Sequence, residues 1–440
     1  MELSLNHRVQ PDSETNQWSE QMLITEKSAI VATSDVWIVA AALVAVFFKL
    51  AIAYNTFGTN DVATFYMFAR SLNDHGLEWT YRNGAVFFSN FPVFNHPPLT
   101  AYYLELIEKV SRMEVLRRYG ITFPFLMRLP GILADLVAVL VLLRMRTASL
   151  APRIPNWAMF LFAMSPVSLM VSGFHGNTDS IMVMFLVVAA YMCLRDRPFL
   201  CGVFFALSCQ VKVVPLLLTP ILWFFWQKRG DAVRFTLPFI LLTMVMWIQP
   251  LAKFPTLFAR NILAYGSYWG SWGITYCLRL TRLPQFDGGF FNLSVAAAAI
   301  ALILKVAIVC AVFVIGWRRR SLGGPAALNS LAHAWIVFFV FSPGVCPQYM
   351  VWLAPFILLL SPALYGWLTA SSSVFLFLLY NALAGGLPWF IAIARNRAPG
   401  LTFATSCSLL PWITLIFGFI LFMKGRNSSI PLDTLRAEQA

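Results

Sequence analysis

The chain has 440 residues, of which 59% are hydrophobic and only 12% are charged. A soluble domain does not carry that balance, so the composition predicts an integral membrane protein. The formal net charge of +13 is spread over short loops between apolar runs. Such spreading is typical of the positive-inside bias of membrane proteins, so we expect no nucleic-acid partner.

Apolar runs recur along the chain and predict an all-α, polytopic membrane protein with about twelve transmembrane helices. The runs are long and lack the alternation of barrel strands, so each is expected to span as a helix. We expect a loosely structured cytoplasmic tail at residues 1–35, a second cytoplasmic tail at 424–440 and a single transmembrane domain at 36–423. The predicted spans are about 36–54, 125–143, 157–172, 181–194, 236–248, 293–317, 327–341, 349–360, 364–384 and 403–423, with two more inside 199–227.

Three polar segments, at about 55–124, 250–291 and 385–402, are predicted to be outer loops. The first is the longest, and it contains helical patterns at about 62–72 and 99–110. Clusters of Lys and Arg at 144–146, 195–197, 228–229 and 318–320 mark the opposite, cytoplasmic ends of the spans. Both termini are therefore expected to be cytoplasmic.

Residues 199–227 are flanked by basic residues at both ends, so the segment is expected to enter the membrane and return. The apolar arms on either side of Lys212 give only about 20 Å each at about 1.5 Å per residue. That is shorter than a hydrocarbon core of about 30 Å, so Lys212 is expected to lie in a polar recess below the outer surface.

The chemically capable residues gather on the predicted outer side. Asp61 follows the first span, and a carboxylate there can act as a general base for a hydroxyl nucleophile. The alternative for Asp61 is a helix N-cap, and Thr178 or Asp179 can likewise simply cap the fourth span. His96 is more often a structural histidine than a functional one. The other members of this group are Asn60, His175, Asn177, Gln348 and Tyr349.

Several cations also lie on the outer side, against the positive-inside bias. Arg128, Lys212, Arg395 and Arg397 are candidates to bind an anion such as a phosphate, although lipid head groups are an equal alternative for each. Asp135 lies seven residues after Arg128 in the same span. A charge at that depth is expected to pair with a charge from another span.

Four sequence elements together resemble the GT-C superfamily of integral-membrane glycosyltransferases. Asp61 after the first span resembles the catalytic acidic residue of the first outer loop, and His96-Pro97-Pro98-Leu99 resembles a motif common in that loop. Gly176-Asn177-Thr178-Asp179-Ser180 resembles the Gly-Gln-x-Asp element of the glycosyltransferase 87 and related mannosyltransferase groups, with Asn177 in place of Gln. The last element comprises Val211-Lys212-Val213-Val214-Pro215 and Pro347-Gln348-Tyr349-Met350-Val351-Trp352.

The resemblance implies an enzyme that transfers a hexose, with mannose favoured, from a polyprenyl-phosphate sugar to an acceptor hydroxyl on the outer face. It implies inversion at the anomeric carbon with Asp61 as general base. The acceptor is expected to be a glycolipid or glycan, and a bacterial inner membrane is favoured. The first loop lacks the paired Asp-Glu of some protein-mannosylating relatives, so no metal or other cofactor is assigned.

Two other functions remain open from the sequence. A transporter or flippase with about twelve spans also needs intramembrane charges and a one-sided recess. The long first loop and the lack of an internal repeat count against it. A structural subunit of a larger complex would not explain why Asp61, Lys212 and Gln348 share one surface.

Overall fold

The computed structural model describes residues 13–84, 93–150, 154–263, 269–286, 293–321, 323–393 and 400–425, with side chains from residue 34 onward. It confirms an all-α polytopic membrane protein. Within the described ranges, eight helical segments are long and apolar enough to cross a membrane. They are Ser34–Asn55 in α1 (Ser13–Asn55), α6 (Phe123–Thr147), Asn156–His175, α12 (Ala232–Lys253), α15 (Val295–Arg319), α16 (Gly324–Phe341), α18 (Pro362–Ala384) and Leu401–Lys424.

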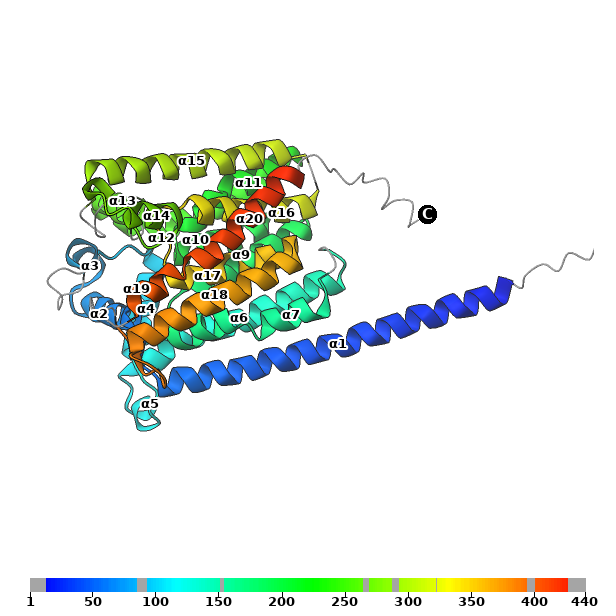
Figure 1. The fold of residues 1–440 in the computed structure, drawn as a ribbon, viewed down its shortest axis with the longest axis horizontal. Coiled ribbons are helices and arrows are strands. Elements are labelled where there is room, and N and C mark those ends of the chain that lie inside the picture. Colours follow the sequence, from blue (N-terminus) through cyan, green and yellow to red (C-terminus); the bar gives the residue numbers. More distant parts are fainter. Residues whose placement is uncertain are drawn as a thin grey trace, which may run out of the picture.

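Three of these spans are built from more than one element or extend beyond the predicted limits. Asn156–His175 consists of α7 (Asn156–Ala163), α8 (Pro166–Ser168) and the π-helix η1 (Leu169–His175). The last span consists of α19 (Leu401–Ser406) and α20 (Leu409–Gly425). Helix α1 begins at Ser13, within the segment predicted to be a loosely structured tail, and Figure 1 shows it running well beyond the bundle.

The remaining predicted spans are shorter helices. They are α9 (Asp179–Leu194), α10 (Pro198–Val211), α11 (Thr219–Lys228) and α17 (Met350–Leu360), the last preceded by the short 3-10 turn η4 (Pro347–Tyr349). The chain breaks at Lys212, and the 3-10 turn η2 (Val214–Leu218) leads into α11. Arg229 Nη1 lies 2.6 Å from Asp196 Oδ1, so the two ends of this segment meet. The predicted reversal of the chain around Lys212 is confirmed.

The polar segments form small elements at one end of the bundle, on the left of Figure 1. The helices predicted at 62–72 and 99–110 are confirmed as α2 (Asn60–His75) and α4 (Pro98–Ser111). The same segments also form α3 (Leu77–Asn83), α5 (Glu114–Arg118), α13 (Pro255–Leu263), α14 (Gly273–Leu280), the 3-10 turn η3 (Pro284–Phe286), and the strands β1 (Gly58–Thr59) and β2 (Ile391–Ala392). We call this end of the bundle the loop end.

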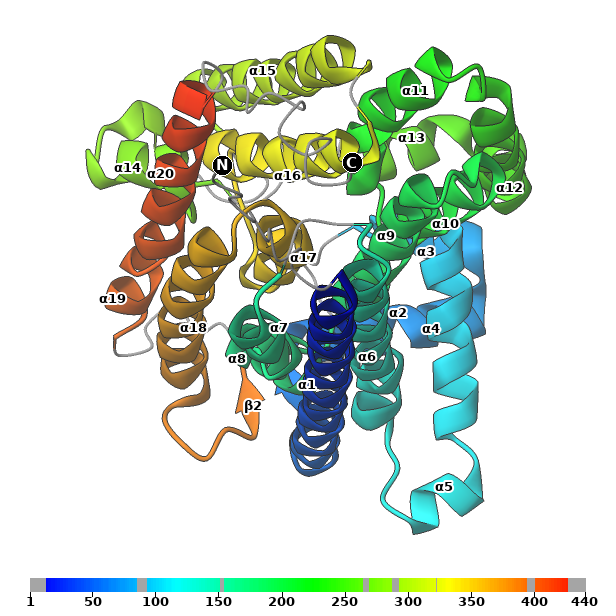
Figure 2. The same ribbon diagram turned by 90° about the vertical axis from the view of Figure 1, so that its right-hand side faces the viewer.

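The hydrophobic core has two main parts. The larger cluster fills the bundle around α17, which lies among α16, α18, α7 and α9 (Figure 2). A second cluster joins α2 and α4 to α12 and α13 through residues such as Phe65, Leu104, Trp247 and Phe258. The first polar segment is therefore packed onto the bundle by its own apolar core, which gives its side chains fixed positions at the loop end.

Hydrogen bonds connect the three polar segments to one another and to the chain break at Lys212. Strands β1 and β2 pair in parallel, with Gly58 opposite Ile391 and Thr59 opposite Ala392. Asn261 of α13 donates to the Tyr81 carbonyl at 2.7 Å. Thr100 Oγ1, at the start of α4, donates to the Val211 carbonyl at 2.9 Å. That last bond holds the start of α4 against the chain break at Lys212.

Candidate active site

Asp61 lies in the first turn of α2, where the chain leaves β1. Thr59 is the N-cap of α2, and its hydroxyl accepts a hydrogen bond from the Asp61 backbone N–H at 3.3 Å. The Asp61 side chain is therefore not the cap of this helix, and it is 26% exposed. The alternative of Asp61 as a helix N-cap is wrong.

Three side chains converge on one oxygen of the Asp61 carboxylate. Asn177 Nδ2 donates to Oδ2 at 2.7 Å, and Gln348 Nε2 donates to it at 3.1 Å. His175 Nε2 lies 3.0 Å from the same oxygen. Among the described residues, none donates a hydrogen bond to Oδ1. The carboxylate is thus held through one of its two oxygens.

Tyr380 extends this arrangement, and the sequence did not point to it. Its hydroxyl lies 2.9 Å from His175 Nδ1. When Tyr380 donates to Nδ1, the neutral imidazole carries its proton on Nε2 and donates it to Asp61. Tyr380 sits in the apolar helix α18 with no motif around it. Only the packing of α18 against η1 brings the two side chains together.

Two glycines permit the close approach of α2 to the segment that carries His175. A Cβ at Gly176 would lie 2.4 Å from Val62 Cγ2, and one at Gly58 would lie 2.7 Å from the Phe174 carbonyl oxygen. Both residues have positive φ, +78° at Gly176 and +103° at Gly58, a region that favours glycine. Any side chain at either position would push Asp61 away from His175.

The surroundings of Asp61 favour its ionised form. Burial acts to raise the pKa of this carboxyl group, but the adjoining His175, the positive charge of Lys212 and the hydrogen bond from Asn177 act to lower it. The net effect lowers the pKa of Asp61 below its ordinary value. Asp61 is therefore a carboxylate at neutral pH, the form that can accept a proton.

A second charged group lies beside the first. Lys212 Nζ lies 2.8 Å from Asp179 Oδ1, and Trp352 Nε1 donates to the same oxygen. Lys212 also lies over two aromatic rings, with Nζ 5.1 Å from the centre of the Tyr349 ring and 5.4 Å from that of Trp352. Lys212 and Asp179 are both buried. The pair is shielded from solvent, so its charges act over a longer range than surface charges do.

The prediction that Thr178 or Asp179 caps the fourth span is not supported. Helix α9 starts at Asp179, and Thr178 occupies the N-cap position without a side-chain hydrogen bond to the helix. Asp179 instead pairs with Lys212. Its second oxygen, Oδ2, is buried and has no hydrogen-bond partner among the described residues, and the same holds for Gln348 Oε1.

His96 and Asn60 lie at the edge of this group. The His96 ring packs against Phe65 and Phe94, with ring centres 5.1 and 5.7 Å apart. Burial and the charge of Lys212 lower the pKa of His96 to about 3, against an opposing effect of Asp61. His96 is therefore neutral at physiological pH. Asn60 is the half-buried first residue of α2.

Arg128 is placed differently from the other predicted cations. It is 1% exposed, and its guanidinium donates to the carbonyl oxygens of residues 53, 56, 124, 173 and 174 and to the Thr56 hydroxyl. These bonds use all of its donor nitrogens. The structure therefore does not favour the prediction that Arg128 binds a phosphate. The Arg128 side chain instead connects the end of α1 to η1.

Two predicted cations, Arg395 and Arg397, lie outside the described residues. Across the described ranges, no three His, Cys, Asp or Glu side chains gather closely enough to hold a metal ion. The structure thus brings together Asp61, His175, Asn177, Gln348 and, beside them, Asp179, Lys212 and Tyr349 with His96 and Asn60.

A comparison with protein families identifies the chain. The sequence model of Glycosyltransferase family 87 matches residues 117–343, which is more than half of the chain. The chain belongs to glycosyltransferase family 87. A search of curated proteins finds no match.

Membership in glycosyltransferase family 87 makes this protein a GT-C-type membrane glycosyltransferase. The matched residues include His175, Asn177, Asp179 and Lys212. Asp61 and Gln348 lie outside the matched segment, before and after it. Asn177 of the matched segment donates to Asp61, and Gln348 donates to the same oxygen, so the site extends over more of the chain than the family match covers.

Proposed function

We propose that this glycosyltransferase moves a single hexose from a polyprenyl-phosphate sugar to an acceptor hydroxyl, with Asp61 as the general base. The observation that carries the proposal is the convergence of His175, Asn177 and Gln348 on Asp61 Oδ2. Three donors fix the carboxylate, and Oδ1 remains available for a substrate hydroxyl. Holding a base in one geometry is what proton transfer in a transition state requires.

The proposed reaction is one displacement with inversion at the anomeric carbon. The acceptor oxygen forms a bond to that carbon while its proton passes to Asp61 Oδ1. The bond from the anomeric carbon to the phosphate oxygen breaks, and its electron pair leaves with the polyprenyl phosphate. Phosphate is a good leaving group, so a single base on the opposite face suffices, and the proton later passes from Asp61 to water.

Lys212 is the described cation best placed to bind the donor phosphate. It is close enough to Asp61 to lower the pKa of that carboxyl group, although one of its contacts is the ion pair with Asp179. A lysine ammonium has three N–H groups, so donors remain after this pairing. We propose Arg395 and Arg397 as further phosphate contacts.

The proposed contacts to the sugar and to the acceptor substrate start from two buried oxygens that lack a hydrogen-bond donor. Gln348 Oε1 and Asp179 Oδ2 are buried and lack partners among the described residues. Buried polar atoms are nearly always hydrogen-bonded in native proteins, so a sugar hydroxyl that donates to them fits both positions. His96, Asn60 and Tyr349 complete the proposed contacts. We favour mannose as the sugar and a glycolipid or glycan as acceptor, on the motif resemblance.

The proposal includes no metal or cofactor, because Lys212 already supplies positive charge beside the carboxylate. Its setting is a bacterial inner membrane, with both termini in the cytoplasm and the site at the outer face. The basic clusters at the end of the bundle opposite the loop end support that orientation. Activity that survives a chelator such as EDTA is expected; loss restored by added magnesium or manganese would contradict the metal-free proposal.

The deciding experiment supplies membranes that contain the protein with a panel of polyprenyl-phosphate sugars and a lipid extract of the host. Release of free polyprenyl phosphate from one donor, lost in Asp61→Asn, is the expected result. Release that survives Asp61→Asn would remove Asp61 from the mechanism. If no donor is cleaved although the extract contains the acceptor, the polyprenyl-phosphate donor is wrong.

A further inference from the structure

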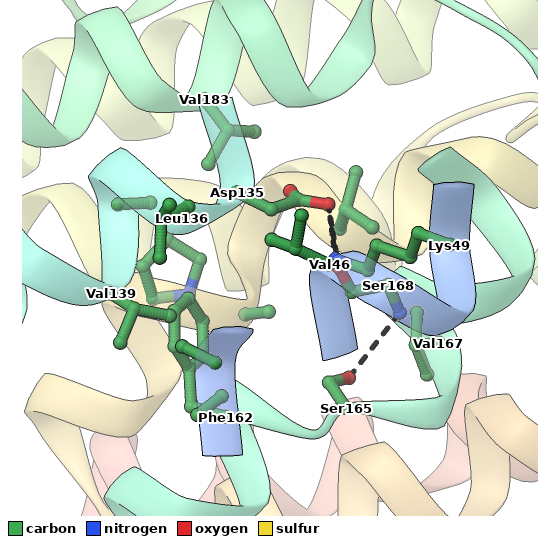
Figure 3. Close-up of a pocket in the computed structure, with 16 residues that line it drawn as sticks. Val46, Lys49, Asp135, Leu136, Val139, Phe162, Ser165, Val167, Ser168 and Val183 are labelled. Atoms are coloured by element: carbon green, nitrogen blue, oxygen red, sulfur yellow. Dashed lines mark hydrogen bonds and ion pairs between the residues drawn. The ribbon is translucent and has the colours of Figure 1, made fainter. Parts of the chain in front are cut away.

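A second charged pair lies inside the membrane-spanning bundle, apart from Asp61. Lys49 Nζ of α1 lies 2.7 Å from Asp135 Oδ2 of α6, and the two side chains are 3% and 18% exposed. Figure 3 shows both side chains at a cavity whose other walls are largely apolar. Ionisable groups at such depth are costly and usually have a role. The expectation that Asp135 pairs with a charge from another span is confirmed.

Two serines join this pair to the segment that carries His175. Ser168 Oγ and Ser172 Oγ both donate to Asp135 Oδ2, at 2.7 and 2.5 Å. Ser168 Oγ also accepts a hydrogen bond from Lys49 Nζ at 2.6 Å. Ser168 is the last residue of α8, and Ser172 lies in η1. One carboxylate oxygen therefore binds a lysine and two consecutive turns of the next span.

The segment η1 is a π-helix of seven residues that ends at His175. π-Helical turns are rare and are frequently found at functional sites. Here the turn delivers the histidine that contacts Asp61 at 3.0 Å and, after Gly176, the asparagine that donates to the same oxygen. The local shape of η1 thus decides where two of the three partners of Asp61 lie.

Helices α1 and α6 hold η1 at both ends. Asp135 binds its beginning through the serines, while Arg128 of the same helix α6 donates to the carbonyls of Gly173 and Phe174 at 3.1 and 3.3 Å. At Gly173 the packing against α1 is close, since a Cβ there would lie 3.3 Å from Lys49 Cα. A change in the contacts of Asp135 or of Arg128 is therefore expected to move His175, because Ser172 and Gly173 lie within one turn of it.

We propose that Asp135, held by Lys49, is a positioning residue for the active site, which sets the place of His175 on Asp61 by fixing Ser168, just before η1, and Ser172 within it. This inference rests on the proposed function only where it concerns turnover. The placement of His175 is a structural consequence that holds for any reaction at Asp61. A displacement of about 1 Å at a catalytic group is enough to lower a rate about 100-fold.

The test uses double variants, because a single change would leave one charge buried without its partner and destabilise the protein. Lys49→Met with Asp135→Leu removes the charges and the carboxylate oxygen that both serines share, and it leaves Ser172 only the Ser168 carbonyl as an acceptor. Lys49→Met with Asp135→Asn removes the same charges but keeps an acceptor oxygen. Replacing a buried pair with apolar residues of similar volume is often neutral in stability, so the Met/Leu variant is expected to fold. Asparagine has nearly the shape of aspartate and can still accept hydrogen bonds from the two serines, so the Met/Asn variant is also expected to fold.

The first measurement is the ring 15N NMR signal of His175 in histidine-labelled protein, which has five histidines. The signal is assigned by its absence in His175→Gln. We expect it to move in the Met/Leu variant and to stay near its wild-type position in the Met/Asn variant. A folded Met/Leu variant with an unmoved signal would overturn the inference, whatever the substrate is.

The second measurement is turnover at saturating donor. We expect kcat to fall at least 10-fold in the Met/Leu variant and to be at least half of the wild-type value in the Met/Asn variant. Equal kcat in both variants would overturn the positioning role. If the wild-type protein turns over no donor, the proposed function fails, and the NMR comparison alone decides the inference. If only the Met/Leu variant fails to fold, the Met/Asn variant is compared with the wild-type protein. A His175 signal that moves in the Met/Asn variant would also overturn the inference.

Discussion

His175 contacts Asp61 across a distance of 3.0 Å although 114 residues separate them in the chain. The contact joins the end of a π-helix to the first turn of α2, and Tyr380 fixes the far side of the same imidazole. A histidine held from both sides keeps one orientation, so the carboxylate it binds is pre-organised.

Asp61→Asn is expected to lower kcat by about 100- to 10,000-fold, the usual contribution of a general base. Asparagine has nearly the same shape, so folding should be retained. The matched control is Asp74→Asn, which changes an exposed carboxylate in the same helix. Turnover is followed as release of polyprenyl phosphate, and equal rates in the two variants would remove Asp61 from the proposed chemistry.

The pH dependence of kcat/KM is expected to report the ionisation of Asp61. Its pKa is lowered in the folded protein, so the active carboxylate persists to low pH and activity is lost as the pH falls through that pKa. Asn177→Ala removes one hydrogen bond that lowers this pKa and should move the acid limb to higher pH. The control Asn83→Ala changes an exposed residue at the end of α3. An acid limb that moves equally in both variants would contradict the assignment.

Lys212 is expected to act in donor binding rather than in proton transfer. Changing Lys212 to Met together with Asp179 to Asn removes the buried pair without leaving one charge alone. We expect the KM for the donor to rise at least 10-fold. The acid limb should persist but move to higher pH, because the charge of Lys212 lowers the pKa of Asp61. Lys228→Met, at the end of α11, serves as the control. A donor KM that is unchanged in the double variant would rule out Lys212 as the phosphate contact.

Gly176→Ala is expected to disturb the site through a steric clash. Its Cβ would lie 2.4 Å from Val62 Cγ2, whereas a Cβ at Gly385, which has a similar φ of +81°, would meet no atom within 4 Å. Gly385→Ala therefore reports the backbone strain alone, about 1 kcal/mol. We expect Gly176→Ala to lose more thermal stability and most activity, with partial recovery on adding Val62→Ala. Equal effects at the two glycines would show that the close approach of α2 is unimportant.

Arg128→Lys is expected to destabilise the protein rather than to weaken donor binding. Lysine cannot reproduce the planar set of donors that binds the carbonyls around Ala53, Thr56 and Gly173. The loss should be about 3 kcal/mol or more, seen as a lower thermal midpoint, because buried carbonyls are left without partners. Arg118→Lys on the exposed helix α5 is the control. Unchanged stability with a raised donor KM would return Arg128 to the phosphate site.

Much of the membrane architecture could be predicted from the sequence. Apolar length is a local property that the bilayer thickness selects, so the predicted spans agree with α6, α15 and α18 to within a few residues at each end. The return of the chain at Lys212 was also predicted, because basic flanks and short arms are visible in the sequence. The predicted loose tail was wrong over the start of α1, where the helix continues back to Ser13.

Local composition and spacing were enough to predict the membrane class, the order of the helices and the polar residues that gather at the loop end. They did not determine which of those residues touch. Asp61 meets Gln348 across 287 residues and His175 meets Tyr380 across 205. Such contacts depend on how the helices pack, and the same local pattern is compatible with many packings. Only the packing of the helices therefore placed Tyr380 on His175, Lys49 on Asp135 and Arg128 among backbone carbonyls.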